Sequence, residues 1–251
     1  MDLTGKRAFV TGGSGDIGGA IARALAGAGV DVAVSYVGNT DGADRSVAAI
    51  HAAGRKGFAV RLDQRDPASI VDAAEKVRGE FGGLDILVNN AGWNIGIPFK
   101  DLETLNEDIW DRVLETNLRG PFLLSRALAG SLRESGSGRI INIASVGGLI
   151  PGSSSIAYSS SKAGLIHLTR CLAVALAPDV TVNCIAPGLV ENTRMARNLP
   201  EKQASAARRQ AVLGKVGSAD DIAEQALVFC RTESITGQLM VVDGGMPGCM
   251  H

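Results

Sequence analysis

The amino-acid sequence predicts a doubly wound α/β fold, in which a parallel seven-stranded sheet carries helices on both faces. Seven short apolar runs, rich in β-branched residues, alternate with longer segments in which apolar residues recur at helical spacing. Strands and helices that alternate in this way form a parallel sheet covered by the connecting helices. A glycine-rich turn follows the first run, and residues 1–251 contain no linker-like stretch, so we expect a single domain.

The expected strands follow one another along the whole chain. Between the first two, Ile17, Ile21, Leu25 and Ala28 recur at the spacing of one helix face. Open parallel sheets bind ligands beyond the carboxyl ends of their strands, so the residues at those ends are candidates for a functional site. The strands are expected at 7–12, 30–36, 57–63, 84–90, 138–145, 180–187 and 238–245, and the candidates are Thr11, Asp63, Asn89, Asn90, Ser145 and Pro187.

Composition and charge argue against several classes of protein. The formal net charge is −1 and Lys and Arg form no run, which disfavours a nucleic-acid partner or a membrane-surface partner. The N-terminal residues lack an apolar signal core, and no stretch of about 18 uncharged apolar residues occurs, so we expect a cytoplasmic protein. The four cysteines and three histidines are scattered without metal-ligand spacing, and neither a metal site nor a disulfide framework is expected.

The segment VTGGSGDIGGA, at the end of the first expected strand, fits two dinucleotide-binding patterns. One, G-x-G-x-x-G, uses Gly13, Gly15 and Gly18; the other, T-G-x-x-x-G-x-G, begins at Thr11 and has Asp16 in place of its middle glycine. In both, small residues let the backbone approach a pyrophosphate, whose charge is favoured at a helix N-terminus. A carboxylate aimed at the pyrophosphate would repel it, so we expect Asp16 to face away and cap the helix.

The end of the second expected strand indicates which nucleotide is used. NAD-specific sites have an acidic residue there, on the ribose hydroxyls, whereas this chain has Ser35 and Tyr36. The missing carboxylate removes the barrier to a 2′-phosphate, so NADP(H) is favoured over NAD(H). No Arg or Lys is evident to bind that phosphate, and Ser35 and Asn39 are expected to hold it by hydrogen bonds, although charge-assisted contacts are normally stronger.

Motifs in the second half of the chain decide between the two glycine patterns. Tyr158 and Lys162 stand four residues apart on one face of an expected helix, Ser145 ends a strand upstream of them, and Asn117 precedes it in ETNLRGPF. Together with NNAG, IAPG and ITGQLMVVDGG, these motifs resemble the short-chain dehydrogenase/reductase family in its single-domain branch. Within it they resemble the 3-oxoacyl reductases, and many xenobiotic, sugar and secondary-metabolite reductases are equally similar in these motifs. The resemblance covers nearly the whole chain and implies a Rossmann fold and the T-G-x-x-x-G-x-G register.

The same resemblance implies an active site for interconverting a ketone and a secondary alcohol, with Asn117, Ser145, Tyr158 and Lys162 at the catalytic positions. A phenol with a pKa of about 10 is a poor acid–base catalyst at neutral pH, and we expect the Lys162 ammonium and the positive nicotinamide to lower that pKa. Tyr158 then transfers the proton, Ser145 hydrogen-bonds the carbonyl oxygen, and Asn117 orders a water that links Lys162 to solvent. The expected cofactor contacts are Gly12, Ser14, Gly15, Asp16, Ile17, Ser35, Asn39, Asp63, Gln64, Asn90, Ala91, Gly92, Tyr158, Lys162, Pro187, Gly188, Val190 and Thr193.

Features outside the motifs bear on the substrate. The resemblance places a substrate lid at about 189–214, whose arginines either bind an anion or form a solvated helix face. Trp93 either walls the pocket or belongs to the core. Members that serve an acyl carrier protein tend to carry basic residues beside the active site, and residues 172–179 have none. That absence favours a small free ketone or alcohol over a 3-oxoacyl thioester. The direction of the reaction stays open, because reduction and oxidation use the same four catalytic residues.

Two other functional classes stay open on the sequence. One is an NADP-binding regulatory or scaffold protein without turnover, which loss of the tyrosine or lysine would mark. The other is a nucleotide-sugar lyase or epimerase, whose usual members are longer. The apolar segments 118–132 and 164–177 resemble the helices through which the family pairs, so a homodimer or homotetramer is expected, with plain core packing as the alternative.

Overall fold

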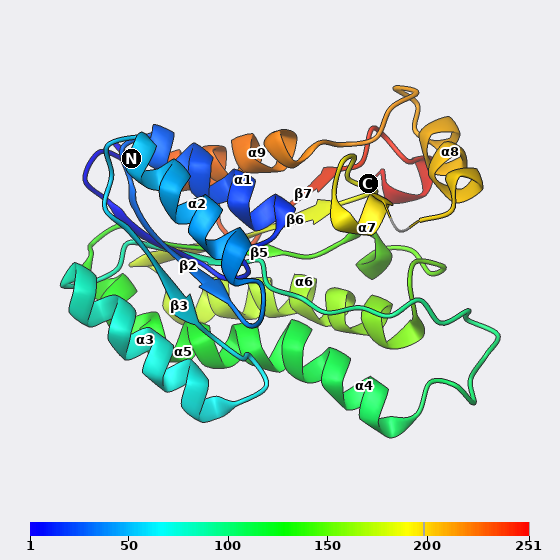
Figure 1. Cartoon of the computed structure of the whole chain (residues 1–251), viewed down its shortest axis with the longest axis horizontal. Coiled ribbons are helices and arrows are strands. Elements are labelled where there is room, and N and C mark those ends of the chain that lie inside the picture. The colour runs from blue at the N-terminus through cyan, green and yellow to red at the C-terminus, as the bar shows by residue number, and fades with distance from the viewer. Residues whose placement is uncertain (198, 251) are drawn as a thin grey trace.

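A computed structural model of the chain describes residues 1–197 and 199–250. Seven strands form one parallel sheet in the order β3-β2-β1-β4-β5-β6-β7, which confirms the predicted doubly wound fold (Figure 1). Every pairing within the sheet is parallel. The strands are β1 (Arg7–Val10), β2 (Asp31–Tyr36), β3 (Gly57–Arg61), β4 (Ile86–Asn89), β5 (Gly138–Ile143), β6 (Val180–Pro187) and β7 (Leu239–Val242).

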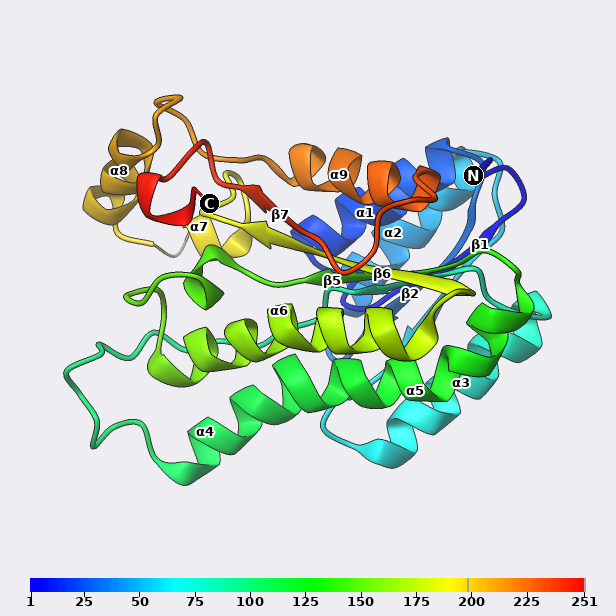
Figure 2. The same cartoon turned by 180° about the vertical axis from the view of Figure 1, so that it is seen from behind.

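Helices cover the sheet on both faces. Helices α1, α2 and α9 lie on one face, and α3, α5 and α6 lie on the other (Figures 1 and 2). Each face has its own buried apolar cluster, so the sheet divides the core in two. The helices are α1 (Asp16–Gly27), α2 (Thr40–Ala52), α3 (Pro67–Phe81), α4 (Glu107–Leu114), α5 (Gly120–Glu134), α6 (Ile156–Leu176), α7 (Arg194–Arg197), α8 (Glu201–Gln210) and α9 (Ala219–Arg231), with a π-helical turn η1 (Glu115–Arg119) and 3₁₀ turns η2 (Val146–Gly148) and η3 (Pro247–Cys249).

Local sequence signals account for these elements. Helix α1 buries Ile21 and Leu25, whose spacing predicted it. Helix α3 begins where the Asp66 carboxylate accepts the backbone N–H of Ala68, and it ends at Gly82, whose φ of 68° is the left-handed conformation that glycine adopts readily. The central strands β4 and β5 are buried along their whole length, as expected where helices cover both faces.

The sheet topology determines where a ligand can bind. Strand β1 lies between β2 and β4, so the connections leaving β1 and β4 run to opposite sides of the sheet and open a crevice at their carboxyl ends. The turns after β1, β4, β5 and β6 all meet at that edge because parallel strands end together. Across the described residues no helix has the length and apolar character needed to cross a membrane, and no cluster of metal-ligating side chains occurs.

Candidate active site

The turn after β1 is joined directly to the turn after β4. The Thr11 hydroxyl is buried and accepts the backbone N–H groups of Asn90 and Ala91 at 3.0 and 2.9 Å. The Asn90 side chain donates to the carbonyl of Thr11 at 2.9 Å. A Cβ at Gly18 would lie 2.4 Å from the carbonyl oxygen of Gly12, so the helix can approach the turn only because residue 18 is glycine. Thr11, Gly12 and Gly18 of the T-G-x-x-x-G-x-G register therefore form the tight part of the turn.

The N-terminus of α1 is open toward this turn. Gly15 occupies the N-cap position, and no side chain caps the helix there. The expectation that Asp16 caps α1 is wrong: Asp16 is the first helical residue, and its carboxylate accepts the backbone N–H of Arg194 at 2.6 Å. Backbone N–H groups at the start of α1 are thus left without a side-chain partner in a glycine-lined cradle, which fits the diphosphate of a dinucleotide. The neighbouring Ile17 packs against the core cluster beneath.

The side chains expected to hold a 2′-phosphate are engaged with the turn itself. Ser35 is 1% exposed, and its hydroxyl accepts the backbone N–H of Gly12 at 2.9 Å. Asn39 donates to the carbonyl of Ser14 at 2.7 Å, while its amide oxygen accepts the N–H of Gly42 and caps α2. These hydrogen bonds shape the cradle, and a contact of Ser35 and Asn39 with a 2′-phosphate stays a prediction.

Residues after β3 form the next part of the same edge. The Asp63 carboxylate accepts the backbone N–H of Arg65 at 3.0 Å, and the Asp63 N–H donates to the hydroxyl of Ser69. Gln64 is 3% exposed and packs closely under α5. A Cβ added at Gly120 would lie 2.7 Å from the Cβ of Gln64. The Gln64 side chain is thus buried in the protein, whereas the Asp63 side chain is less buried.

Helix α6 carries Tyr158 and Lys162 on one buried face. Its N-cap, Ser155, accepts the backbone N–H of Tyr158 at 3.2 Å and so sets the start of the helix one turn before the phenol. The Lys162 ammonium lies 5.8 Å from the centroid of the Tyr158 ring and donates to the carbonyl of Ile143, at the end of β5, at 2.8 Å. Ser145 follows two residues later and caps η2 by accepting the N–H of Gly147. The strand end and the helix therefore bring these three side chains together.

Asn117 lies in the π-helical turn η1, and its side chain is fully buried. Its amide forms a pair of hydrogen bonds with the backbone of Trp93, accepting at 2.8 Å and donating at 2.9 Å. It also donates to the hydroxyl of Ser161 at 3.1 Å, and that hydroxyl donates to the carbonyl of Tyr158. Ser155 and Ser161 were missed by the sequence analysis, although both stand in the serine-rich segment around Tyr158.

The nucleotide cradle and the catalytic side chains meet at Gly92. A Cβ there would lie 3.3 Å from the Asn117 amide oxygen and 3.6 Å from the Lys162 nitrogen, so glycine keeps this space open. The end of β6 closes the other side, where a Cβ at Gly188, the residue after Pro187, would lie 2.7 Å from the Cβ of Asp243. The predicted catalytic and cofactor residues, apart from the corrected side chains, thus line one continuous edge of the sheet.

Burial shifts the pKa values of both Tyr158 and Lys162. It raises the pKa of Tyr158 above its usual value of 10.0, and a hydrogen bond with Ser145 opposes that rise. It also lowers the pKa of Lys162 from 10.5 to about 8, because an ammonium without water is destabilised. In the protein without a nicotinamide, desolvation of the phenol is the largest cause of the shift in its pKa. The lowering expected from the ammonium together with a bound, positively charged nicotinamide stays a prediction.

The lid lies against both halves of the site. Thr193, at its start, is buried, donates to the carbonyl of Val190 at 2.9 Å and accepts the N–H of Ala196. Of the lid arginines, Arg208 pairs with two glutamates of the lid, and the Arg197 guanidinium lies 3.7 Å from the Asp16 carboxylate. The guanidinium groups of Arg197 and Arg208 thus form ion pairs with carboxylates of this chain.

Trp93 belongs to the wall beside Tyr158. It packs against the cluster of Val113, Ala157 and Tyr158, and the guanidinium of Arg112 lies 4.2 Å from its ring centroid. Its ring is thus held between α4 and the start of α6, next to the Tyr158 phenol.

A doubly wound sheet with a glycine turn at its switch point, and a serine, tyrosine and lysine at the adjoining strand end and helix, defines a dinucleotide-dependent oxidoreductase. A family model described as short chain dehydrogenase matches residues 6–204. The chain is 38% identical to the 3-oxoacyl-(acyl-carrier-protein) reductase of Escherichia coli (strain K12), over 98% of this chain and 99% of that protein. The chain belongs to the short chain dehydrogenase family.

Solved structures agree with this assignment. A short chain dehydrogenase from Burkholderia cenocepacia J2315 in complex with NADP superposes with a TM-score of 0.89 at 38% identity, covering 98% of this chain and 99% of that chain. A variant of the actinorhodin polyketide ketoreductase with NADPH gives a TM-score of 0.88 at 31% identity, covering 96% of this chain and 97% of that chain. The protein is an NAD(P)-dependent oxidoreductase that acts on C=O and CH–OH groups.

Proposed function

We propose that this enzyme reduces a small, free ketone with NADPH, using Tyr158 as the proton donor. The observation that carries this proposal is the convergence of Tyr158, Lys162, Ser145 and Asn117 beside the opening at Gly92. The nicotinamide cofactor supplies the hydride when it is bound. The remaining chemistry is the work of this chain's own side chains.

Tyr158 is suited to give a proton to the carbonyl oxygen. The buried phenol keeps its proton at neutral pH, because burial raises its pKa. Giving up that proton to the carbonyl oxygen depends on the positive charge of Lys162 and of a bound nicotinamide, which favour the phenolate. Ser145 hydrogen-bonds the same oxygen as negative charge develops on it. Lys162 is fixed by the carbonyl of Ile143 at 2.8 Å and stabilises the phenolate that remains. The side-chain amide of Asn117 bonds to the backbone of Trp93 and to the hydroxyl of Ser161, and so positions the start of α6 beside the substrate wall.

The preference for NADP(H) rests on the end of β2. No carboxylate stands at Ser35 or Tyr36, so nothing there repels a 2′-phosphate. Strand β3 pairs Arg61 in register with Tyr36, and Arg61 is exposed. Because paired residues of parallel strands project to the same face, this guanidinium can give the phosphate a charge-assisted contact, which Ser35 and Asn39 cannot supply. Arg61→Ala is expected to raise KM for NADPH about tenfold and leave KM for NADH unchanged.

The surface around α6 supports a free substrate rather than one carried by an acidic protein. Residues 172–179 contain no Lys or Arg, and Val174 on this segment is 82% exposed. A carrier protein with a negative surface would be attracted by cations at this position, and the segment itself offers none. The Arg133 guanidinium of α5 lies beside it and donates to the carbonyl of Ala175 at 3.2 Å, so the comparison of free and carrier-bound substrates in the panel below is the test of this point.

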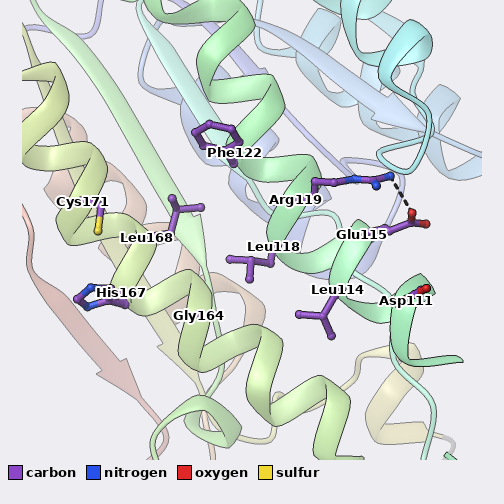
Figure 3. A pocket seen from close by; sticks show the side chains of 10 residues that line it. All are labelled: Asp111, Leu114, Glu115, Leu118, Arg119, Phe122, Gly164, His167, Leu168 and Cys171. Carbon is purple, nitrogen blue, oxygen red and sulfur yellow. Dashed lines mark ion pairs between the residues drawn. The ribbon is translucent and has the colours of Figure 1, made fainter. Parts of the chain in front are cut away.

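The outer face of α5 and α6 supports a homo-oligomer. A cavity of about 610 Å³ opens there between the two helices, lined by apolar side chains that include Leu114, Leu118 and Leu168 (Figure 3). Phe122 on its rim is 40% exposed. We propose that a second copy of the chain covers this apolar groove. Phe122→Glu is expected to shift the mass measured by light scattering toward the monomer, and an unchanged mass would contradict this interface.

The test of the function is a substrate panel assayed with NADPH and NADH side by side. The panel contains small diketones, keto sugars and β-keto thioesters of coenzyme A and of acyl carrier protein, with Tyr158→Phe as the blank. We expect faster turnover of a free ketone with NADPH and none in the variant. Preference for the carrier-bound thioester would overturn the proposed substrate class. Tight NADPH binding with no turnover on any ketone would favour a scaffold protein instead.

A further inference from the structure

The carboxylate of Asp16 binds two groups of the lid helix α7. Its Oδ2 accepts the backbone N–H of Arg194, the first residue of α7, at 2.6 Å, and its Oδ1 lies 3.7 Å from the guanidinium of Arg197. Thr193 caps the same helix by accepting the N–H of Ala196 at 3.2 Å. The first turn of α7 is thus held by its own threonine and by a residue 178 positions earlier in the chain.

The other side of α7 contacts the loop that follows β4. The Asn94 side-chain amide donates to the sulfur of Met195 at 3.8 Å, and Asn94 follows Trp93 beside the catalytic tyrosine. One helical turn therefore spans from the glycine turn of the nucleotide cradle to the wall of the substrate site. A group that holds α7 in place acts on both sites together.

We propose that Asp16 is a positioning residue that clasps the lid across the nucleotide cradle. The inference rests on the proposed function, because it takes the cradle between Gly12 and Thr193 to be the cofactor site. A glycine at this position of the motif has no side chain to reach α7, so the clasp is a property of Asp16. A cofactor that leaves only when the lid opens will then dissociate more slowly while the clasp is intact.

The two contacts of Asp16 differ in strength, so different substitutions at this position are expected to have effects of different size. The hydrogen bond to a backbone N–H is charge-assisted and short, whereas the ion pair joins side chains that are 38% and 60% exposed and is weakened by water. Asp16→Asn keeps an oxygen for the Arg194 N–H and loses the ion pair. Asp16→Gly loses both contacts and is expected to have the larger effect.

A competing account predicts the opposite sign. If the Asp16 carboxylate acts mainly by repelling the diphosphate at the start of α1, removing its charge will tighten nucleotide binding. If Asp16 instead holds the lid in place, the same substitutions open the lid and speed nucleotide release. The direction of the change therefore decides between the two.

The experiment measures NADPH dissociation by stopped-flow fluorescence in the full-length protein. Relative to wild type, we expect release to be about threefold faster in Asp16→Asn and in Arg197→Gln, and about tenfold faster in Asp16→Gly. Arg197→Gln also loses the hydrogen bond from the guanidinium to the Asn192 carbonyl. The Asp16→Asn/Arg197→Gln double variant should therefore behave like Arg197→Gln alone, because the ion pair is already lost there. Glu80→Gln breaks an ion pair of similar exposure, with Lys56, far along the chain and is the matched control.

Trypsin cleavage within the lid, followed by mass spectrometry without nucleotide, gives a second readout. We expect faster cleavage after Arg194 and Arg197 in Asp16→Gly and unchanged cleavage in Glu80→Gln. Slower NADPH release in the Asp16 variants, or unchanged release with unchanged cleavage, would overturn the clasp. If NADPH does not bind at all, the proposed function fails, and the cleavage comparison still tests the clasp.

Discussion

Lys162→Met tests whether the buried ammonium of Lys162 lowers the free energy of unfolding. Burial lowers the pKa of Lys162 from 10.5 to about 8, and its side chain is 4% exposed, so water does little to screen that cost. Between these two values the unfolded chain holds a proton that the folded protein has released. The free energy of unfolding contributed by this lysine therefore rises with pH above about 8 and is lost as the pH falls back through that value.

The magnitude follows from the two pKa values. Between pH 7 and pH 9 the folded lysine loses most of its proton while the unfolded lysine keeps it, which corresponds to about one pKa unit, or about 1.4 kcal/mol. Burial also raises the pKa of Cys184 to about 11 and of Cys230 to about 12, and these thiols act in the opposite direction above pH 9. Cys184 and Lys162 each shift the pKa of the other, so the comparison is limited to pH 9 and below. There both folded thiols keep their protons with or without Lys162, and their contributions cancel in the difference between the two proteins.

The assay is urea unfolding, followed by circular dichroism, at pH 7, 8 and 9. The unfolding free energy of wild type minus that of Lys162→Met is expected to increase by about 1.4 kcal/mol across this range. Lys76→Met, at an exposed position of α3, is the matched control and should show no such change. A wild-type-minus-Lys162→Met difference that stays flat or falls between pH 7 and 9 would refute the reasoning, because it would mean that the ammonium is not desolvated.

Three further substitutions test the stability of the fold that carries the site. Gly148→Ala places a Cβ 2.7 Å from the backbone of Lys162, so we expect a loss of about 1–3 kcal/mol in stability, by thermal unfolding, together with reduced turnover. Asp85→Ala removes a buried carboxylate that accepts from Arg7 at 2.7 and 2.9 Å and should cost about 2 kcal/mol; a smaller loss than Glu80→Gln would contradict this. Asn142→Leu breaks the fully buried amide network between β4, β5 and α6 and should cost about 2 kcal/mol in urea unfolding, whereas an unchanged midpoint would show that the network contributes nothing.

The architecture could be predicted because it depends on local patterns. Strands buried on both faces require continuous apolar runs, and α1 requires apolar residues on one side, so Ile21 and Leu25 indicated their helix without any tertiary information. The residues of the candidate site were predictable for a related reason. Parallel strands end at one edge, and Tyr158 and Lys162 are four residues apart on a helix, so sequence position alone places them together.

Only the tertiary structure decided which partners the polar side chains have. Ser35 and Asn39 stand at the predicted edge, yet their hydrogen bonds go to the glycine turn, and Asp16 turns from its own helix to the lid. The sign of the Tyr158 pKa shift likewise depends on how much water the surrounding chain removes. Sequence by itself determined the fold class, the edge of the sheet and the catalytic residue types, because these follow from periodicity and topology. The partners of polar groups and the cost of burying charge were decided by contacts between distant segments, which no local pattern records.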